Sequence, residues 1–514
     1  MQLRRVARPF VLVACVGSAA CSAILGLEAP PEGSGADAST DTTTSDGTTG
    51  NEGGTPEGST GDAGTDGPVC LPLDAGGLGN VTYNALHNAV LPEGGTTWEF
   101  FEPNSVSAGA HDFLGGTFDG RYIYFAPNST STITRYDTTQ GFQTGASWSV
   151  FDAHALVPAG VGFEGAVFDG HYVYFVPDHL PGAYTGTVVR FDKNGSFTNN
   201  GPQWSVFDLT TLPFADAGSL VGFGGGTFDG QNVYFAPLQD QAMHLSRVIR
   251  YTPALAGDGG GPVEAGVTGD AGDAGHDGGV PEAGPPVFST AAAFSSFDLT
   301  IKDNAAAGYL GGTFDGHFTY LAPLVNNSTS HGLVARYDTT SGFTTGPAWG
   351  VFDLTVVNAG AIGFNGAAFD GRYVYLVPHN RTIVARYDTK DGVLQHAAAW
   401  STFDMSTVTP ADAGTPAFSG GAFDGRFVYF VPNLAGGQGS GGIVRYDTYS
   451  TFGDTCAWTY FDVSSLVAGA TSYFGAVYDG QYLYLVPRGT WVARFQSKNA
   501  NVMPSLPAFS GSFL

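Results

Sequence analysis

A short motif occurs seven times in this 514-residue chain and limits its fold more than any other feature. One copy, residues 115–127, reads GGTFDGRYIYFAP, and every copy has an aromatic residue, Asp and Gly at its centre. The central aromatic residues are Phe118, Phe168, Phe228, Phe314, Phe369, Phe423 and Tyr478. Successive copies are 50 to 60 residues apart, except for one gap of 86. A period near 50 residues is typical of propeller blades and other repeat arrays, so we expect a repeat fold.

Each repeat predicts four short strands, described here for the first copy. Strand A covers residues 113–118, strand B 121–127, strand C 133–137 and strand D 148–152. The Asp-Gly pair between strands A and B predicts a two-residue hairpin turn with both residues at positive φ. Strand B is apolar on both alternating faces, as expected for a strand covered on both sides. No segment of comparable strength has apolar residues at helical spacing, so the sequence predicts an all-β fold.

The two ends of the repeat array complement each other. Residues 97–102 read TWEFFE, a strand D motif with no strands A to C before it. The last repeat, residues 473–495, has strands A to C and no clear strand D after them. We therefore expect a seven-bladed β-propeller of four-stranded blades over 76–496, closed by the N-terminal strand, because closure removes open sheet edges. An open solenoid is the alternative, but it would need capping repeats at both ends.

Residues present in every repeat are expected to serve the scaffold. The Asp of Asp-Gly should form the hairpin, and Arg135 and Asp137 of the strand C motif Arg-Tyr-Asp should pair with each other or with the backbone. A ring of carboxylates that binds calcium is the functional alternative. The Gly-Gly doublet followed by aromatic residues resembles kelch repeats. Kelch repeats place the doublet after a hydrophobic strand, with Tyr and Trp later, so no kelch residue or function is transferred to this chain.

Residues 1–21 have the pattern of a secretion signal. Three arginines precede the apolar run 11–20, which is too short to span a bilayer as a helix. Small residues then lead to Cys21, which resembles the lipidated cysteine of bacterial lipoprotein signals. The resemblance implies a lipid anchor in the outer membrane of a Gram-negative bacterium, because Ser22 and not Asp follows the cysteine. Residues 12–15 form a second candidate lipobox, and an ordinary cleaved signal is the remaining alternative.

Two segments are rich in small, polar and acidic residues and contain neither Lys nor Arg. The linker 22–75 has ten acidic residues, and the insertion 253–287 in the third repeat has six. Such compositions cannot bury enough apolar surface to become ordered, so we expect disorder there, and a tail at 497–514. These sixteen acids account for much of the net charge of −26, so the remainder is only mildly acidic. The absence of a basic patch argues against a nucleic-acid partner.

Two cysteines remain after the signal segment. Cys70 ends the linker and Cys456 precedes a strand D motif. In an oxidising compartment this pair favours a Cys70–Cys456 disulfide, and two unpaired thiols are the alternative. No spacing of Cys or His indicates a zinc site, and the sequence predicts neither a metal nor a cofactor.

Positions that differ between repeats are where we expect function. The second residue of strand A, the residue after the strand B proline and the B–C loops all change in polarity from repeat to repeat. In propellers the B–C and D–A loops share one face, where ligands usually bind. The candidate binding residues on this face are Glu164, Asp178, His179, His379, Arg381, Asn433 and Arg488. The alternative for each residue is a solvated loop tip.

These features favour a lipid-anchored, monomeric binding module over an enzyme. No pair of carboxylates across a pocket and no nucleophile elbow stands out in the sequence. The ligand would be a glycan, a cell-wall component or a protein partner in the envelope. One alternative is an extracellular polysaccharide hydrolase or lyase that uses Glu164 with a loop acid or histidine. A structural envelope lipoprotein without enzymatic activity is the other.

Overall fold

The structure is a computed structural model, and it describes most of the repeat region. The described residues are 77–78, 81–87, 97–180, 182–214, 219–253, 288, 290–411, 417–435 and 438–500. The chain divides into two units, residues 1–72 and 73–514, and all described residues belong to the second. The signal segment with Cys21, the whole linker, almost all of the insertion, and the residues beyond 500 lie outside the described residues. In the described part of the chain no helix is long and apolar enough to cross a membrane.

The strands follow the seven repeats, and we number the resulting units 1 to 7. Unit 1 consists of β4 (Phe113–Phe118), β5 (Tyr122–Pro127), β6 (Thr132–Asp137) and β7 (Trp148–Asp152). Units 2 and 3 consist of β8 (Phe163–Phe168), β9 (Tyr172–Pro177), β12 (Thr187–Asp192) and β13 (Trp204–Asp208), and of β14 (Phe223–Phe228), β15 (Val233–Pro237), β16 (Arg247–Tyr251) and β17 (Phe294–Asp298). Units 4 and 5 consist of β18 (Tyr309–Phe314), β19 (Phe318–Pro323), β22 (Leu333–Asp338) and β23 (Trp349–Asp353), and of β24 (Phe364–Phe369), β25 (Tyr373–Pro378), β26 (Ile383–Asp388) and β27 (Trp400–Asp404). Units 6 and 7 consist of β28 (Phe418–Phe423), β29 (Phe427–Pro432), β32 (Gly442–Asp447) and β33 (Trp458–Asp462), and of β34 (Tyr473–Tyr478), β35 (Tyr482–Pro487), β36 (Val492–Gln496) and β3 (Trp98–Phe101).

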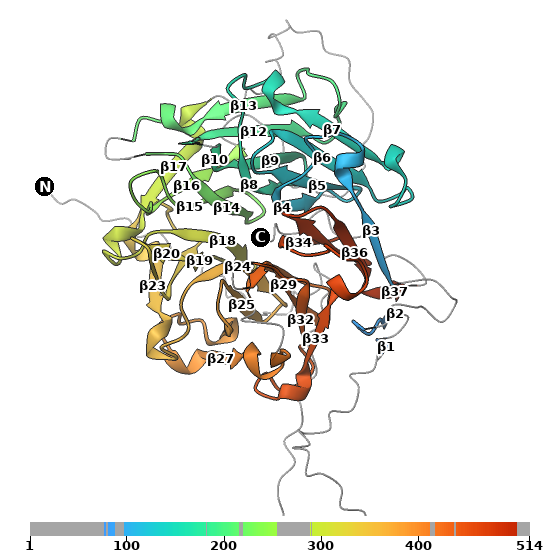
Figure 1. The fold of residues 1–514 in the computed structure, drawn as a ribbon. Coiled ribbons are helices and arrows are strands. Elements are labelled where there is room, and N and C mark those ends of the chain that lie inside the picture. The colour runs from blue at the N-terminus through green and yellow to red at the C-terminus, as the bar shows by residue number, and fades with distance from the viewer. Residues whose placement is uncertain are drawn as a thin grey trace, which may run out of the picture. The chain divides into compact units, whose positions relative to one another are not determined.

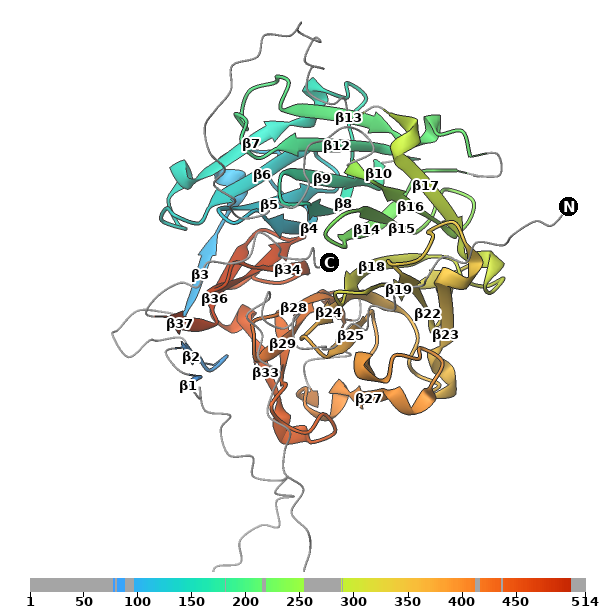
Figure 2. The same ribbon diagram turned by 180° about the vertical axis from the view of Figure 1, so that it is seen from behind.

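Neighbouring strands within each unit are antiparallel. One parallel pair, Gly224 with Leu310, joins units 3 and 4 into an eight-stranded sheet. The first strands of the units contact one another in a cycle, β4–β8–β14–β18–β24–β28–β34 and back to β4. Figures 1 and 2 show these strands on the inside and last strands such as β13, β23 and β33 on the outside. The described chain is therefore all-β, as the sequence predicts, with a β-propeller repeat fold.

Short 3-10 turns flank most of the D strands. Those after a D strand are η1 (Pro103–Ser105), η3 (Ala153–Ala155), η4 (Leu209–Thr211), η7 (Leu299–Ile301), η9 (Leu354–Val356), η12 (Met405–Thr407) and η15 (Val463–Ser465). Except after β3, the aspartate that ends the D strand caps the turn by accepting a backbone N–H, as Asp208 does from Thr210. The Asp of the Trp-x-x-Phe-Asp motif thus ends one strand and begins the connection to the next unit.

The turn between strands A and B differs from the sequence prediction. Asp119 N donates to Tyr122 O at 3.1 Å, so the two central turn residues are Gly120 and Arg121. Gly120 has φ of 96°, whereas Asp119 and Arg121 do not have positive φ. A positive φ at the first central position alone is the pattern of a type II′ turn. The expectation that Asp and Gly both adopt positive φ is therefore wrong.

The Asp of the repeated Asp-Gly pair holds this turn through its side chain. In unit 1 the Asp119 carboxylate accepts N–H bonds from Arg121 at 2.8 Å and Tyr122 at 2.6 Å, and the Tyr124 hydroxyl at 2.7 Å. The same three bonds recur in every unit. These carboxylates already have three donors each, so the structure assigns them to the scaffold and not to a calcium ring.

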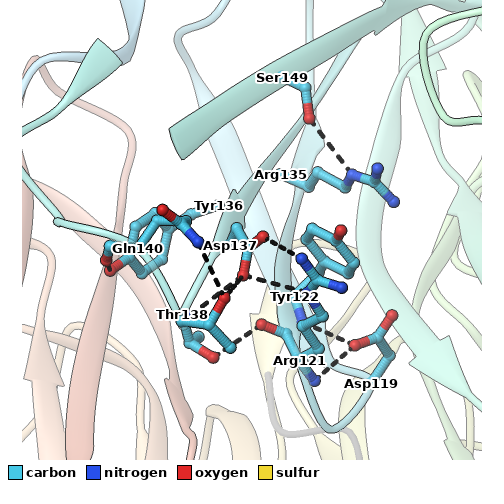
Figure 3. Close-up of polar contacts among 10 residues, drawn as sticks. Asp119, Arg121, Tyr122, Arg135, Tyr136, Asp137, Thr138, Gln140 and Ser149 are labelled. Carbon is cyan, nitrogen blue, oxygen red and sulfur yellow. Dashed lines mark hydrogen bonds and ion pairs between the residues drawn. The ribbon is translucent and has the colours of Figure 1, made fainter. Parts of the chain in front are cut away.

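The Arg and Asp of the strand C motif do not pair with each other, but the alternative expectation of backbone pairing is met by the aspartate, since Thr139 N donates to Asp137 Oδ1 at 3.1 Å. Asp137 binds Arg121, with Arg121 Nη2 at 2.7 Å, while Arg135 lies over the Tyr122 ring at 3.9 Å and donates to Ser149 (Figure 3). The equivalent aspartates pair with Arg or His in four further units. In units 3 and 7, where Thr252 and Gln496 replace the aspartate, the partner position is glutamine. The position after Asp-Gly therefore changes together with the end of strand C.

The units are joined by one recurrent aromatic contact. The Phe of each Trp-x-x-Phe-Asp strand stacks on the Trp of the next unit, with ring centroids 4.0 to 5.9 Å apart. The pairs are Phe101–Trp148, Phe151–Trp204, Phe207–Phe294, Phe297–Trp349, Phe352–Trp400, Phe403–Trp458 and Phe461–Trp98. Phe294 replaces Trp in unit 3 and keeps the stack. Aromatic pairs of this kind stabilise beyond the area they bury.

Residues 81–87, which we call the strap, supply a contact that unit 7 lacks. In unit 6 the Trp458 indole donates to the Phe452 carbonyl in the preceding C–D loop. Unit 7 has no such loop, because its D strand, β3, precedes its other strands in the sequence. Leu86 of the strap is fully buried, and its carbonyl accepts the Trp98 indole at 3.4 Å. The strap therefore takes the place of a C–D loop.

The strap is held by a small sheet that the sequence pattern did not indicate. Its strand β2 (Val81–Tyr83) pairs with β1 (Gly77–Leu78) and with β37 (Lys498–Ala500). The Asn84 carbonyl accepts a bond from buried Arg445 Nη1 at 2.9 Å. The chain thus remains paired past residue 496.

We predict that alkaline pH destabilises the fold through the tyrosines bound to the seven aspartates. Burial, followed by the nearby aspartate charge, raises the pKa of Tyr124, Tyr174, Tyr234, Tyr320, Tyr375, Tyr429 and Tyr484. Above pH ~10 the unfolded chain loses these protons while the folded chain keeps them, so stability is full below that pH and falls as pH rises. Each tyrosine should reduce the free energy of unfolding by about 1.4 kcal/mol per pH unit.

The measurement is the melting temperature between pH 8 and 11.5, with tyrosinate absorbance followed in parallel. Replacing Tyr429 by Phe should make the fall of stability with pH less steep, because one proton fewer is released on unfolding. Ionisation of all tyrosines near pH 10 with the fold intact would contradict the prediction.

Candidate functional site

The positions that vary between repeats lie at one end of the sheets, which we call the variable end. Strand A has a β-bulge in every unit, where its second residue is followed by a glycine at positive φ. These second residues are Leu114, Glu164, Gly224, Leu310, Asn365, Ser419 and Phe474. A bulge redirects the side chain of the residue it contains, so the seven units present their variable side chains in the same way.

The residue after each strand B proline lies at the same end. Its amide donates to the residue before strand A of its own unit at 2.8 to 3.2 Å. These residues are Asn128, Asp178, Leu238, Leu324, His379, Asn433 and Arg488. The thirteen side chains at these fourteen positions, one of which is Gly224, divide into one apolar and two polar groups.

The apolar group comes from units 1, 3, 4 and 7. Leu114, Leu238, Leu310 and Phe474 form one buried cluster, against which Leu324 packs. Units 1 and 4 are not neighbours in the cycle of first strands. Their side chains therefore meet inside that cycle. The sequence shows that these positions vary but does not predict this cluster.

The first polar group is built on Glu164 and Asp178 of unit 2. Both are almost fully buried, with 5% and 2% of their surface exposed, and their carboxyl groups are hydrogen-bonded to each other. Burial and then the Asp178 charge hold the pKa of Glu164 well above its usual range, which favours the protonated form that can donate to Asp178. Asp178 Oδ2 also lies 2.5 Å from His179 Nδ1, and this bond raises the pKa of the half-exposed His179.

Arg488 of unit 7 connects this group to unit 1. Its Nε lies 3.7 Å from Asp112 Oδ1, and Asp112 Oδ2 accepts bonds from Asn128 and Ser129. The Arg488 charge also acts on Glu164 and His179. Arg488 and His179 are the exposed members of a charged cluster drawn from units 7, 1 and 2.

The second polar group lies between units 5 and 6. Asn365 Nδ2 donates to Ser419 Oγ at 2.6 Å, and both residues are fully buried. The largely buried His379 is hydrogen-bonded to the Phe418 backbone, and the amide of Asn433 donates to Ala417 O at 2.8 Å. Burial lowers the pKa of His379, so its ring is neutral. Asn365 and Ser419 extend this group beyond the candidates chosen from the sequence.

Arg381 differs from the other candidates. Its side chain is exposed at the tip of the B–C loop of unit 5, and it has neither a hydrogen bond nor an ion pair with the described residues. Units 2, 4 and 6 replace such a tight loop by small hairpins, β10 (His179–Leu180) with β11 (Ala183–Tyr184), β20 (Val325–Asn326) with β21 (Thr329–Ser330), and β30 (Leu434–Ala435) with β31 (Gln438–Gly439). The structure thus brings Glu164, Asp178, His179 and Arg488 together, and leaves Arg381 separate at the surface.

Cys456 is disulfide-bonded. It lies in η14 (Thr455–Ala457), and its partner falls outside the described residues. The pairing with Cys70 therefore stays a prediction. Among the described residues no three His, Cys, Asp or Glu side chains form a group suited to a metal ion.

Comparisons with known proteins identify no family for this chain. No protein-family model and no curated protein matches it. Similar solved structures include a streptogramin B lyase (14% identity, 79% of this chain and 97% of that chain, TM-score 0.48). Others are virginiamycin B lyase from Staphylococcus aureus (10%, 78% and 98%, TM-score 0.47) and BamB from Moraxella catarrhalis (12%, 75% and 85%, TM-score 0.37). At these levels no activity is transferred to this chain.

Proposed function

We propose that the seven units close into a seven-bladed β-propeller over 76–496, with β3 as the outer strand of the last blade. Three observations support closure. The first strands contact one another in a complete cycle. Strand β3 pairs with β36, with Trp98 opposite Phe495. The Phe–Trp stack recurs between Phe461 and Trp98, where the two ends of the repeat array meet.

If the ring is closed, Trp98 should be as important to stability as a tryptophan inside the array. Trp98→Ala removes an almost fully buried ring and should lower the free energy of unfolding by about 3–5 kcal/mol. Trp458→Ala is the matched variant at the junction of units 5 and 6, and the partly exposed Trp491→Ala is the control. Chemical unfolding of the three variants is the measurement. A Trp98 variant as stable as the control would indicate an open array.

We further propose that the chain is exported and lipid-anchored at Cys21 in the outer membrane of a Gram-negative cell. The proposed organisation is a signal segment (1–21), a linker (22–75), the propeller with its insertion (253–287), and a tail (497–514). A linker of ~50 residues would span on the order of 40 Å as a flexible coil. Support comes from the sequence pattern and from the disulfide at Cys456, since disulfides persist in oxidising compartments.

Cys21→Ser should release the protein from the membrane fraction and prevent incorporation of labelled fatty acid. Cys15→Ser is the control and should leave both unchanged. Fractionation of expressing cells with mass spectrometry of the N-terminal peptide tests this. Membrane retention of the Cys21 variant would exclude this anchor.

The function that we propose is ligand binding at the variable end, by a monomeric surface module. The observation that carries the proposal is the charged cluster around Arg488, in which titratable groups from units 7, 1 and 2 interact beside the apolar cluster. A few polar groups next to apolar side chains are typical of ligand sites, and perturbed pKa values gather at functional sites. Candidate ligands are a glycan, a cell-wall component or an envelope protein.

Binding should depend on the exposed members of the charged cluster. Arg488→Ala and His179→Ala should each raise the dissociation constant at least tenfold, because each removes a charged contact with the ligand. Lys390→Ala is the control, since this exposed residue lies in the C–D turn at the opposite end. The melting temperature of the mature chain is measured with polysaccharides, cell-wall fragments and an envelope extract. A ligand at 100 times its dissociation constant adds about 2.7 kcal/mol. Binding that survives both substitutions would place the site elsewhere.

A hydrolase or lyase is the second candidate, and the bond between Asp178 and His179 favours it. An aspartate on Nδ1 orients an imidazole and leaves Nε2 free to exchange a proton with a ligand. The Glu164 carboxyl group interacts with Asp178 and so influences the charge that Asp178 presents to His179. Incubation of any ligand found above with the wild type and with Glu164→Gln, followed by chromatography, separates the two functions. Products from the wild type alone would establish catalysis, and an intact ligand would leave binding as the function.

A further inference from the structure

The buried polar atoms at the variable end that lack a partner are all potential acceptors. They are Asn128 Oδ1, Asp178 Oδ1, Asn365 Oδ1, His379 Nδ1 and Asn433 Oδ1. Buried polar side-chain atoms nearly always have a hydrogen-bond partner, so each exception needs an explanation. For Asp178 the neighbouring Glu164 carboxyl group is the candidate donor, because the raised pKa of Glu164 favours its protonated form. The other four have no donor within the described residues.

Three of these residues are attached, through other atoms, to one short segment, residues 417–419. Asn365 is bonded to Ser419, His379 to the Phe418 backbone, and the Asn433 amide to Ala417. Asn365 and Asn433 are 0% and 2% exposed, so their free oxygens face the protein interior. The group between units 5 and 6 therefore presents two amide oxygens and one imidazole nitrogen without donors.

The histidine is oriented as a ligand would be. His379 Nδ1 has no partner, so its bond to the Phe418 backbone is made by Nε2. A bond from Nε2–H to the Phe418 carbonyl would keep the lone pair on Nδ1. Histidines that bind metals almost always donate their other ring N–H to a carbonyl or carboxylate in this way.

We propose that a divalent first-row transition-metal ion binds between units 5 and 6, held by His379 Nδ1 and by the amide oxygens of Asn365 and Asn433. One water could donate to only two of the three acceptors, whereas a metal ion accepts all three. Imidazole suits Zn²⁺, Ni²⁺, Co²⁺ and Mn²⁺ better than Ca²⁺ or Mg²⁺, which prefer oxygen ligands. The three protein ligands are neutral and leave coordination positions for water. The Arg488 charge also acts on His379, so this site lies within reach of the charged cluster. It does not depend on the ligand proposed there, because its three protein ligands belong to units 5 and 6.

The test uses the mature chain after treatment with chelator, with each metal ion added alone and no glycan present. Mn²⁺, Co²⁺, Ni²⁺ or Zn²⁺ should raise the melting temperature, and Ca²⁺ and Mg²⁺ should raise it less. Bound Co²⁺ should also give a visible spectrum that reports nitrogen ligation. His379→Phe should raise the dissociation constant for the metal at least tenfold and abolish the Co²⁺ spectrum. His379→Gln is the second variant, in case the larger ring disturbs folding, and should alter the Co²⁺ spectrum.

The matched control is Asn128→Leu, the equivalent position in unit 1, where leucine already occurs in units 3 and 4. Asn128→Leu should leave the dissociation constant for the metal within twofold of the wild-type value, whereas Asn433→Leu should raise it. Absence of a shift with every divalent ion, or an equal loss in the Asn128 and Asn433 variants, would overturn the proposal. A shift with methylammonium as large as that with the metals would also overturn it, in favour of an ammonium ligand.

Discussion

The carboxylate of the Asp-Gly pair is the constraint on which each unit depends. Asp424 is 1% exposed and binds two backbone amides and the Tyr429 hydroxyl. Because the carboxylate satisfies that hydroxyl, the tyrosine can be buried between two units, and strand B can be covered on both faces. A buried hydroxyl without a partner would cost about 1–3 kcal/mol. The same arrangement in seven units explains why this short motif recurs with so little change.

Much of the scaffold could be predicted from the sequence, because every unit repeats the same local problem. Strands A to D lie within a few residues of their predicted limits. The pairing of Arg135 with Asp137 was wrong because Arg135 stacks on Tyr122, a contact between strands that a linear motif does not reveal. The correct partner left a signal in the repeats, since the arginine or histidine is absent wherever the aspartate is absent. The strap was missed because residues 81–87 match no repeat, although they supply the contact that unit 7 lacks.

The variable end was predicted as a location but not as an arrangement. Comparison of the seven repeats identified the positions, because they differ where the scaffold does not constrain them. Which side chains meet depends on contacts between units far apart in the sequence, such as Arg488 with Asp112 or the apolar cluster that contains Leu114 and Leu310. The same reasoning could not separate Arg381, which is isolated at the surface, from Asp178, which is buried among partners.

The two kinds of residue at the variable end allow a comparison within one molecule. Units 3 and 4 carry Leu238 and Leu324 at the positions where other units carry Asn128 and Asn433. The leucines pack in an apolar cluster, whereas both asparagines bury an oxygen without a donor. Leucine is therefore compatible with this backbone position, and asparagine there carries a cost of about 1–3 kcal/mol. At Asn128 the scaffold gives part of the reason, because Asn128 Nδ2 donates to Asp112 Oδ2. At Asn433 no side-chain hydrogen bond to the described residues does so, and the polar choice there is best explained by something that its oxygen binds.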